Sequence, residues 1–227
     1  MKSTVKTALI STLPVLTGYL VLGFGFGIIL KSSGFGILLA FIMSAFIYAG
    51  SMQYVAIGLL TGGASLITVF ITTLMVNARH LFYGISMLTK YRNVGKIKPY
   101  LIFALTDETY SLVCSENLPV SLEHKNIYYL LVSLFNHIYW ITGSVLGALA
   151  GTLINFDSSG IDFALTALFL TVFLEQWPSS KNHTPAVIGV LAAAVCLLLF
   201  GSENFLIPTM LLITVLLCVI GEGKTDG

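Results

Sequence analysis

The polar group Asn77-Ala78-Arg79-His80 interrupts a long apolar stretch of the chain. On one continuous helix Asn77 and His80 would share a face, because residues three apart are neighbours. A guanidinium binds a carboxylate through two parallel hydrogen bonds, so Arg79 could bind the carboxylate of a small solute. The alternative is that Arg79 extends to a nearby membrane surface, since a basic stretch starts at Lys90.

The adjacent acids Asp107 and Glu108 form the second group with possible chemistry. Neighbouring residues on a helix point about 100° apart, so the two carboxylates do not face one site as a pair. Burial favours the neutral form of a carboxylate, which suits a proton carrier in a membrane. One acid could therefore line a cavity while the other pairs with Arg79. The alternative is a purely structural ion pair that holds two helices together.

The segment Tyr48-Ala49-Gly50-Ser51-Met52-Gln53 places small and polar residues inside an apolar run. An unwound helix there would present backbone polar groups to the ammonium and carboxylate of an amino acid. A close helix contact through Ala49 and Gly50 explains the same residues equally well. Later in the chain, Asn136 and Trp140 would share a helical face. His137, beside them, is expected mainly to make structural hydrogen bonds.

These groups define the predicted site. The predicted substrate-binding residues are Tyr19, Phe26, Tyr48, Ser51, Gln53, Asn77, Arg79, Asn136 and Trp140, and the predicted proton-coupling residues are Asp107, Glu108 and His80.

The composition indicates that these polar groups belong to an integral membrane protein. Of 227 residues, 56% are hydrophobic and only 9% are charged, whereas soluble domains carry about 25% charged residues. The mean hydropathy of +0.94 agrees. A net charge of +1 argues against nucleic-acid binding, which needs a basic face.

No motif indicates catalysis, a cofactor or a metal. The chain lacks a P-loop, an H-E-x-x-H and a G-x-S-x-G sequence. Cys114, Cys196 and Cys218 have neither metal-binding spacing nor a disulfide pattern. We therefore expect a protein that is not an enzyme and needs no cofactor.

Hydropathy predicts an all-α polytopic fold in one membrane domain, residues 1–227. About 20 apolar residues span a bilayer, and Thr61-Gly62-Gly63 breaks the longest apolar run. Seven or eight hydrophobic segments result, the main ones being 8–30, 35–60, 64–86, 99–114, 127–154, 163–173, 185–200 and 205–220.

A similarity between two parts of the sequence suggests two repeated halves, 8–115 and 127–220. Gly23-x3-Gly27 precedes Ser32-Ser33-Gly34, and Gly147-x3-Gly151 precedes Ser158-Ser159-Gly160. Such repeats recur in transporters. The alternative is chance, because glycine-rich helices pack closely throughout membrane proteins.

The basic residues constrain the topology. Lys2 and Lys6 place the N-terminus in the cytoplasm, and Lys90 to Lys98 should lie there too. Three full crossings between them would put the second cluster outside, so one segment is broken or re-entrant. The best candidate for the break is Tyr48 to Gln53. With one re-entrant segment, the two halves would be inverted relative to each other.

The ordered set of these motifs resembles the AzlC family. The residues that carry the resemblance are Leu13-Pro14, Gly18-Tyr19, Gly23-x3-Gly27, Tyr48-Ala49-Gly50-Ser51-x-Gln53, Asn77-Ala78-Arg79-His80-x2-Tyr83-Gly84, Thr106-Asp107-Glu108, Trp140, Gly147 with Gly151, Asp162-Phe163-Ala164 and Leu174-Glu175-Gln176-Trp177.

The resemblance implies the large subunit of a bacterial branched-chain amino acid exporter in the cytoplasmic membrane. Its substrates would be Leu, Ile and Val, often with Met, and its driving force the proton gradient. It also implies a small AzlD-like membrane partner and a hetero-oligomer. The alternatives from the residues alone are a channel, or a membrane assembly or regulatory subunit that transports nothing.

Overall fold

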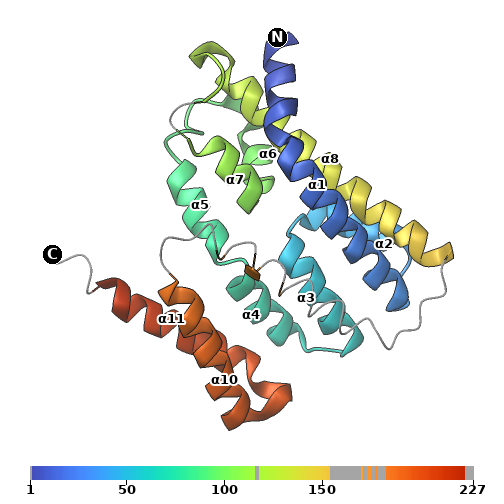
Figure 1. Ribbon diagram of the computed structural model, residues 1–227, viewed down its shortest axis with the longest axis vertical. Coiled ribbons are helices and arrows are strands. Elements are labelled where there is room, and N and C mark those ends of the chain that lie inside the picture. Colours follow the sequence, from blue (N-terminus) through green and yellow to red (C-terminus); the bar gives the residue numbers. More distant parts are fainter. Residues whose placement is uncertain are drawn as a thin grey trace. The chain divides into compact units, whose positions relative to one another are not determined.

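The computed structural model describes residues 2–115, 118–153, 170, 173, 174, 177 and 183–222, and the regular elements in these ranges are all helical. This agrees with the predicted all-α fold. The chain forms two compact units, Met1–Leu165 and Thr166–Gly227 (Figure 1). Several sequence features lie outside the described residues: the motifs Ser158-Ser159-Gly160 and Asp162-Phe163-Ala164, and Glu175, Gln176 and Pro178. Of the predicted segment 163–173, only Leu170 and Phe173 are described.

The first unit holds three long or bent helices and several short ones. In chain order they are α1 (Lys2–Ser32), α2 (Ile37–Ile42), the π-helical turn η1 (Met43–Ile47), α3 (Gly50–Thr61), α4 (Leu66–Val76), α5 (Arg79–Met87), the 3-10 turn η2 (Gly95–Ile97), α6 (Lys98–Phe103), α7 (Asp107–Val113), the 3-10 turn η3 (Leu122–His124) and α8 (Lys125–Leu153).

Helices α1 and α8 run parallel with their backbones in contact. A Cβ atom on Gly27 would lie 2.1 Å from the carbonyl oxygen of Ser144, and one on Gly147 would lie 2.0 Å from that of Phe24. Gly151, one turn further on, faces Lys31. Only glycine permits so close an approach, as in other small-residue helix pairs of membranes.

Both helices begin at the same end of the unit. A buried apolar cluster joins Ala8 near the start of α1 to Tyr128 near the start of α8, and it includes Tyr91 and Val94 from the basic loop 90–98. We call this end the basic end, and the end where α1 and α8 finish the opposite end. The start of α1, with Lys2 and Lys6, and the basic loop 90–98 therefore lie at the same end. The side of the membrane that this end faces stays a prediction.

The segment after α1 folds as a hairpin that enters from the opposite end. Helix α2 and η1 return from the end of α1 until the carbonyl of Ser44 lies 3.3 Å from Nε2 of His137, midway along α8. Helix α3 then starts beside Trp140 at Gly50 and runs back, so that Tyr54 packs on Phe26 of α1. Neither arm crosses the unit.

The tip of this hairpin is Tyr48-Ala49. Tyr48 adopts a left-handed conformation with φ of 46°, which is unusual for a bulky residue and marks stored strain. The amide of Tyr48 still donates to the carbonyl of Met43, five residues back. The helix therefore breaks within the segment that the sequence singled out.

Helices α4 and α5 form one bent element, with an angle of 48° between them. The chain bends at Asn77-Ala78, where the sequence predicts a continuous span. Met87 at the end of α5 belongs to the apolar cluster of the basic end. The pair therefore traverses the unit from the opposite end to the basic end.

A second hairpin, α6 and α7, enters from the basic end. Leu101 of α6 and Val113 of α7 both lie in the apolar cluster of that end. The tip between them, residues 104–106, reaches the middle of α1, where the hydroxyl of Thr106 lies 2.7 Å from that of Tyr19. The predicted segment 99–114 thus turns back instead of crossing.

Residues 166–227 belong to the other unit, so an inverted relation of the predicted halves 8–115 and 127–220 as a whole stays a prediction. Their first helices, α1 and α8, run parallel. Between the starts of α1 and α8 only α1 and the α4–α5 pair traverse the unit, so α8 runs parallel to α1. An inverted arrangement exists inside the first unit. There α1 is followed by a hairpin from the opposite end, and the antiparallel α4–α5 pair by a hairpin from the basic end.

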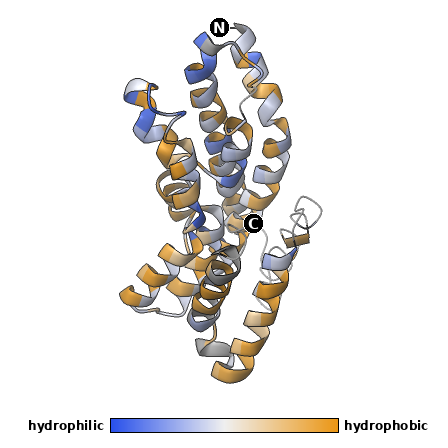
Figure 2. Cartoon of the chain, turned by 90° about the vertical axis from the view of Figure 1, so that its left-hand side faces the viewer, coloured by the Kyte–Doolittle hydropathy of each residue, from blue (hydrophilic) through white to orange (hydrophobic). Residues whose placement is uncertain are grey.

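Candidate membrane spans are fewer than the seven or eight predicted segments. Three described helices are long and apolar enough, Ser3–Ser32, Lys125–Leu153 and Thr184–Gly201, and α4–α5 makes a fourth if counted as one span. Segments 35–60 and 99–114 fold as pairs of short helices, and 205–220 corresponds to the 17-residue α11. Most of segment 163–173 lies outside the described residues. Figure 2 shows hydrophobic residues along most helices and hydrophilic ones among the helices of the first unit.

The second unit contains α10 (Thr184–Asn204) and α11 (Leu206–Glu222), which pack on each other. They correspond to the predicted segments 185–200 and 205–220. Gly201 interrupts α10 with φ of 72° and ψ of 171°, a conformation that glycine adopts readily.

Candidate functional site

Polar side chains from five helices meet in the middle of the first unit, between the tips of the two hairpins. We call this set the central polar cluster. Its members are Tyr19 of α1, Ser51 and Gln53 of α3, Arg79 of α5, Thr106, Asp107, Glu108 and Thr109 at the start of α7, and Asn136 and Trp140 of α8.

Arg79 joins three helices. One guanidinium nitrogen forms an ion pair with Asp107, and the other donates to the hydroxyl of Ser51 at 3.0 Å. The side chains of Arg79 and Asp107 are 36% and 30% exposed, so the pair is partly desolvated. Nε of Arg79 and Oδ1 of Asp107 are buried and have no partner among the described residues. The pair therefore keeps unused hydrogen-bonding capacity.

Tyr19 binds the neighbouring acid. Its hydroxyl donates to Oε2 of Glu108 at 2.6 Å. The hydroxyl of Thr106 lies 3.1 Å from that of Thr109, which in turn accepts from Nδ2 of Asn136 at 3.0 Å. The two acids thus point to different partners, as their adjacent positions on a helix predict.

Gln53 fastens the first hairpin to α8. Its carbonyl oxygen accepts from Nε1 of Trp140 at 2.9 Å, and its amide nitrogen donates to Ser44 at 3.3 Å. Gln53 is fully buried, and Trp140 is 4% exposed. The Trp140 ring also packs against Gly50, where a Cβ atom would lie 3.1 Å from it. These contacts indicate that Gln53 and Trp140 position the hairpin tip.

Three helices begin at this cluster: α3 at Gly50, α5 at Arg79 and α7 at Asp107. Helix starts carry unpaired N–H groups and a partial positive charge. Thr106 caps α7 by accepting from the amide of Thr109 at 3.3 Å, whereas no side chain caps α3. The arrangement therefore attracts carboxylates, and the chain supplies two of its own.

Two predicted residues carry unused polar atoms in or beside the cluster. Tyr48 is 3% exposed, its ring centroid lies 4.3 Å from that of His137, and its hydroxyl has no partner among the described residues. Asn136 is fully buried, and its Oδ1 likewise has none. Buried polar atoms are normally paired, so both are candidates for contact with a solute.

Three predicted residues lie apart from the cluster. His80 faces a different pocket, and its Nδ1 lies 3.1 Å from the carbonyl of Asn77. Asn77 ends α4, with Oδ1 buried and unpaired among the described residues. Phe26 is fully buried between the rings of Trp140 and Tyr54, which makes it a packing residue.

Sequence reasoning missed Ser44 and Thr109 and did not separate Thr106 from the acids beside it. Thr106 had a usable signal, because a threonine before an acidic first turn is a typical helix cap. His137 bonds Tyr100 and the backbone of Ser44, as its predicted structural role requires. Among the residues that the structure describes, no group of three or more His, Cys, Asp or Glu could hold a metal ion.

Comparison with known proteins gives the family. The AzlC protein family matches residues 14–154. The "Branched-chain amino acid transport protein AzlC" of Bacillus subtilis (strain 168) is 43% identical over 95% of this chain and 84% of its own length. An "Uncharacterized membrane protein" of Helicobacter pylori (strain ATCC 700392 / 26695) is 42% identical over 93% of this chain and 92% of its own.

A more distant relative is "Inner membrane protein YgaZ" of Escherichia coli (strain K12), 26% identical over 95% of this chain and 91% of its own length. No solved structure matches the chain. The family match includes both hairpins and every member of the central polar cluster, and the chain is a membrane protein of the AzlC family.

Proposed function

We propose that this protein is a permease that exports branched-chain amino acids, Leu, Ile and Val and often Met, with the proton gradient as its driving force. One observation carries the proposal. Three helix starts and Arg79 meet at a partly buried cluster between two hairpin tips that enter from opposite ends. The relative named as a branched-chain amino acid transport protein supports the substrate class.

The carboxylate of the amino acid binds Arg79 by taking the place of Asp107. Both are carboxylates. Asp107 pairs with one terminal nitrogen of Arg79, and a guanidinium can hold a substrate carboxylate through two hydrogen bonds. The uncapped start of α3 adds backbone N–H donors beside Ser51. The ammonium then lies near the released acid, and the apolar side chain near the rings of Tyr19 and Trp140.

Displacement of Asp107 supplies the coupling. As a carboxylate, the displaced acid pairs with the ammonium of the substrate, and its protonation from outside the cell releases the substrate. Proton and amino acid therefore occupy the site in turn, as export driven by an inward proton gradient requires. Glu108, held by Tyr19, is the second proton acceptor. Through its hydrogen bond with Tyr19, Glu108 connects α1 to the tip of the second hairpin, so a change in its protonation affects both.

The two hairpins act as the gates of an alternating-access cycle. Each reaches the cluster from one end only, so moving one tip opens the cluster to one side of the membrane. The left-handed conformation of Tyr48 stores strain at the first tip, and release of that strain assists its movement.

The protein resides in the bacterial cytoplasmic membrane with its N-terminus in the cytoplasm. The support is the shared basic end, where the start of α1 lies with the loop that holds Lys90, Arg92, Lys96 and Lys98, together with the positive-inside rule. A small AzlD-like subunit completes a hetero-oligomer.

The test is transport of labelled leucine in liposomes across an imposed pH gradient, with and without the co-expressed small subunit. We expect saturable flux that reverses when the gradient is reversed. Flux that never saturates would favour a channel. Absence of flux under every condition would favour an assembly or regulatory subunit and would refute the proposal.

A further inference from the structure

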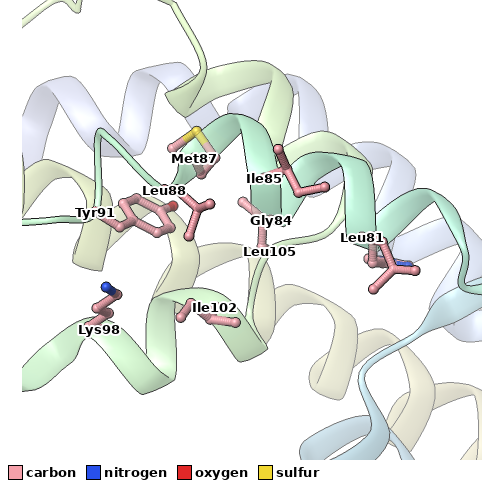
Figure 3. A pocket seen from close by; sticks show the side chains of 10 residues that line it. Leu81, Gly84, Ile85, Met87, Leu88, Tyr91, Lys98, Ile102 and Leu105 are labelled. Atoms are coloured by element: carbon pink, nitrogen blue, oxygen red, sulfur yellow. The ribbon is translucent and has the colours of Figure 1, made fainter.

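A pocket lies between α5 and α6, on the side of these helices away from the central polar cluster. Its volume is about 330 Å³. Apolar side chains of both helices, among them Leu81, Ile85, Leu88 and Ile102, form most of its wall (Figure 3). His80 also lines the pocket, and the proposed transport mechanism uses none of its lining residues.

Two polar groups stand at the end of the pocket nearest the basic loop. Tyr91 is 2% exposed, and its hydroxyl has no hydrogen-bond partner among the described residues. Figure 3 shows that hydroxyl directed into the pocket, with the ammonium group of Lys98 on the same side. A buried donor without a partner is unfavourable, so the site suits a ligand that carries an acceptor.

The pocket opens to the outer surface of the unit. Leu81, Ile85 and Leu88 are 70%, 65% and 58% exposed, and Ile102 is 52% exposed. In a membrane protein such a surface faces lipid chains. A ligand enters this pocket sideways from the bilayer and needs no path from water.

The dimensions fit one lipid chain. Nine residues of α5 extend about 13.5 Å at 1.5 Å per residue, close to half of a hydrocarbon core about 30 Å thick. Dividing the volume by this length gives a cross-section of roughly 25 Å², against about 80 Å² for a helix 10 Å across. The space therefore admits a chain of methylene groups and excludes a helix.

We propose that this pocket binds one anionic phospholipid of the leaflet at the basic end. An acyl chain lies between α5 and α6, and the phosphate accepts from Tyr91 and pairs with Lys98. Arg92 and Lys96 nearby make the potential at this end positive, and basic pockets between membrane helices attract anionic headgroups. The lipid joins the bent span to the second hairpin, so its presence stabilises their packing.

Native mass spectrometry of the full chain tests this with dimyristoyl phosphatidylglycerol and dimyristoyl phosphatidylcholine as probes. We expect one tightly held phosphatidylglycerol and at least about tenfold weaker phosphatidylcholine. Lys98→Gln should reduce this preference to about twofold or less. Lys31→Gln, at the opposite end of the unit, is the matched control and should keep it.

Gly84→Leu separates the pocket from the headgroup contact. A Cβ atom at Gly84 meets nothing within 4 Å, so the new side chain fills the pocket without strain in the helix. We expect loss of both lipids, while Gly58→Leu, equally open, should retain them. Unchanged phosphatidylglycerol in Gly84→Leu would overturn the proposal. If Gly84→Leu lost a co-purified protein subunit and no lipid, that result would also overturn the proposal.

Discussion

Replacement of Arg79 by glutamine distinguishes a binding residue from a structural ion pair. The substitution removes the ion pair with Asp107 and the 3.0 Å hydrogen bond to Ser51. An exposed pair contributes about 0–1 kcal/mol, and loss of one partner of a buried pair costs about 3–5 kcal/mol. Because these side chains are 36% and 30% exposed, we expect a loss of about 1–3 kcal/mol in the free energy of unfolding.

Arg79→Gln should also weaken leucine binding, and this effect is independent of the loss of stability. A hydrogen-bonded contact to a charged group contributes about 1.5–3 kcal/mol. With about 1.4 kcal/mol for each factor of ten, Arg79→Gln should weaken leucine binding by roughly 10- to 150-fold. Isothermal titration of the purified protein measures the affinity, and urea titration followed by fluorescence measures the stability.

The double variant Arg79→Gln/Asp107→Asn gives the decisive comparison. Removing both charges relieves the unpaired acid, so most of the lost stability should return. Leucine affinity should stay low, because the carboxylate of the substrate still lacks its partner. Arg92→Gln, at an exposed position on the basic loop, is the matched control and should bind normally. Wild-type leucine affinity in the double variant would refute the role of Arg79 in binding.

Three further predictions test the coupling and the packing. Glu108→Gln should abolish leucine efflux driven by a pH gradient but spare leucine exchange, and full gradient-driven efflux would contradict this. Gly27→Leu should lower the midpoint of thermal unfolding strongly, since overpacking costs at least about 1–3 kcal/mol, whereas Gly18→Ala should leave it almost unchanged. Trp140→Phe leaves the carbonyl of buried Gln53 unpaired and should lower the free energy of unfolding, measured by urea titration, by about 1–3 kcal/mol. When Gln53 is already leucine, Trp140→Phe should cause no such loss.

The break at Tyr48-Ala49 could be predicted from sequence because its cause is local. Small and polar residues interrupt an apolar run, and they cannot continue a helix buried in lipid without cost. The bend at Asn77-Ala78 also falls at a polar group, but such a group is equally compatible with a continuous helix that ends near the membrane surface. The bend is accompanied by the contacts of Arg79 with residues distant in the chain.

The same bend explains why the sequence placed His80 in the predicted site, although its side chain faces the outer pocket. Neighbour rules for Asn77 and His80 assume a single continuous helix, but α5 starts anew after Ala78. The new helix directs Arg79 to the cluster and His80 to the outer pocket. A helical phase cannot be carried across a break that the sequence does not reveal.

Hydropathy identified the segment 99–114 but not its path. A short apolar stretch can cross a membrane obliquely or turn back within it, and composition is the same for both. The choice depends on tertiary contacts such as that of Thr106 with Tyr19. The path of this one segment decides whether α8 runs parallel or antiparallel to α1, and therefore how the first helices of the two predicted halves are related.

The backbone contact between α1 and α8 limits which parts of the molecule can move. With no side chains between Gly27 and the peptide of Ser144, or between Gly147 and that of Phe24, the two helices have no rotamers with which to absorb a shift. The two helices therefore move as one rigid body, which we call the α1–α8 strut. Any conformational cycle must leave this strut intact and place its displacements in the hairpins or at the bend of α4–α5, so labels attached along α1 and α8 will keep fixed mutual distances throughout turnover.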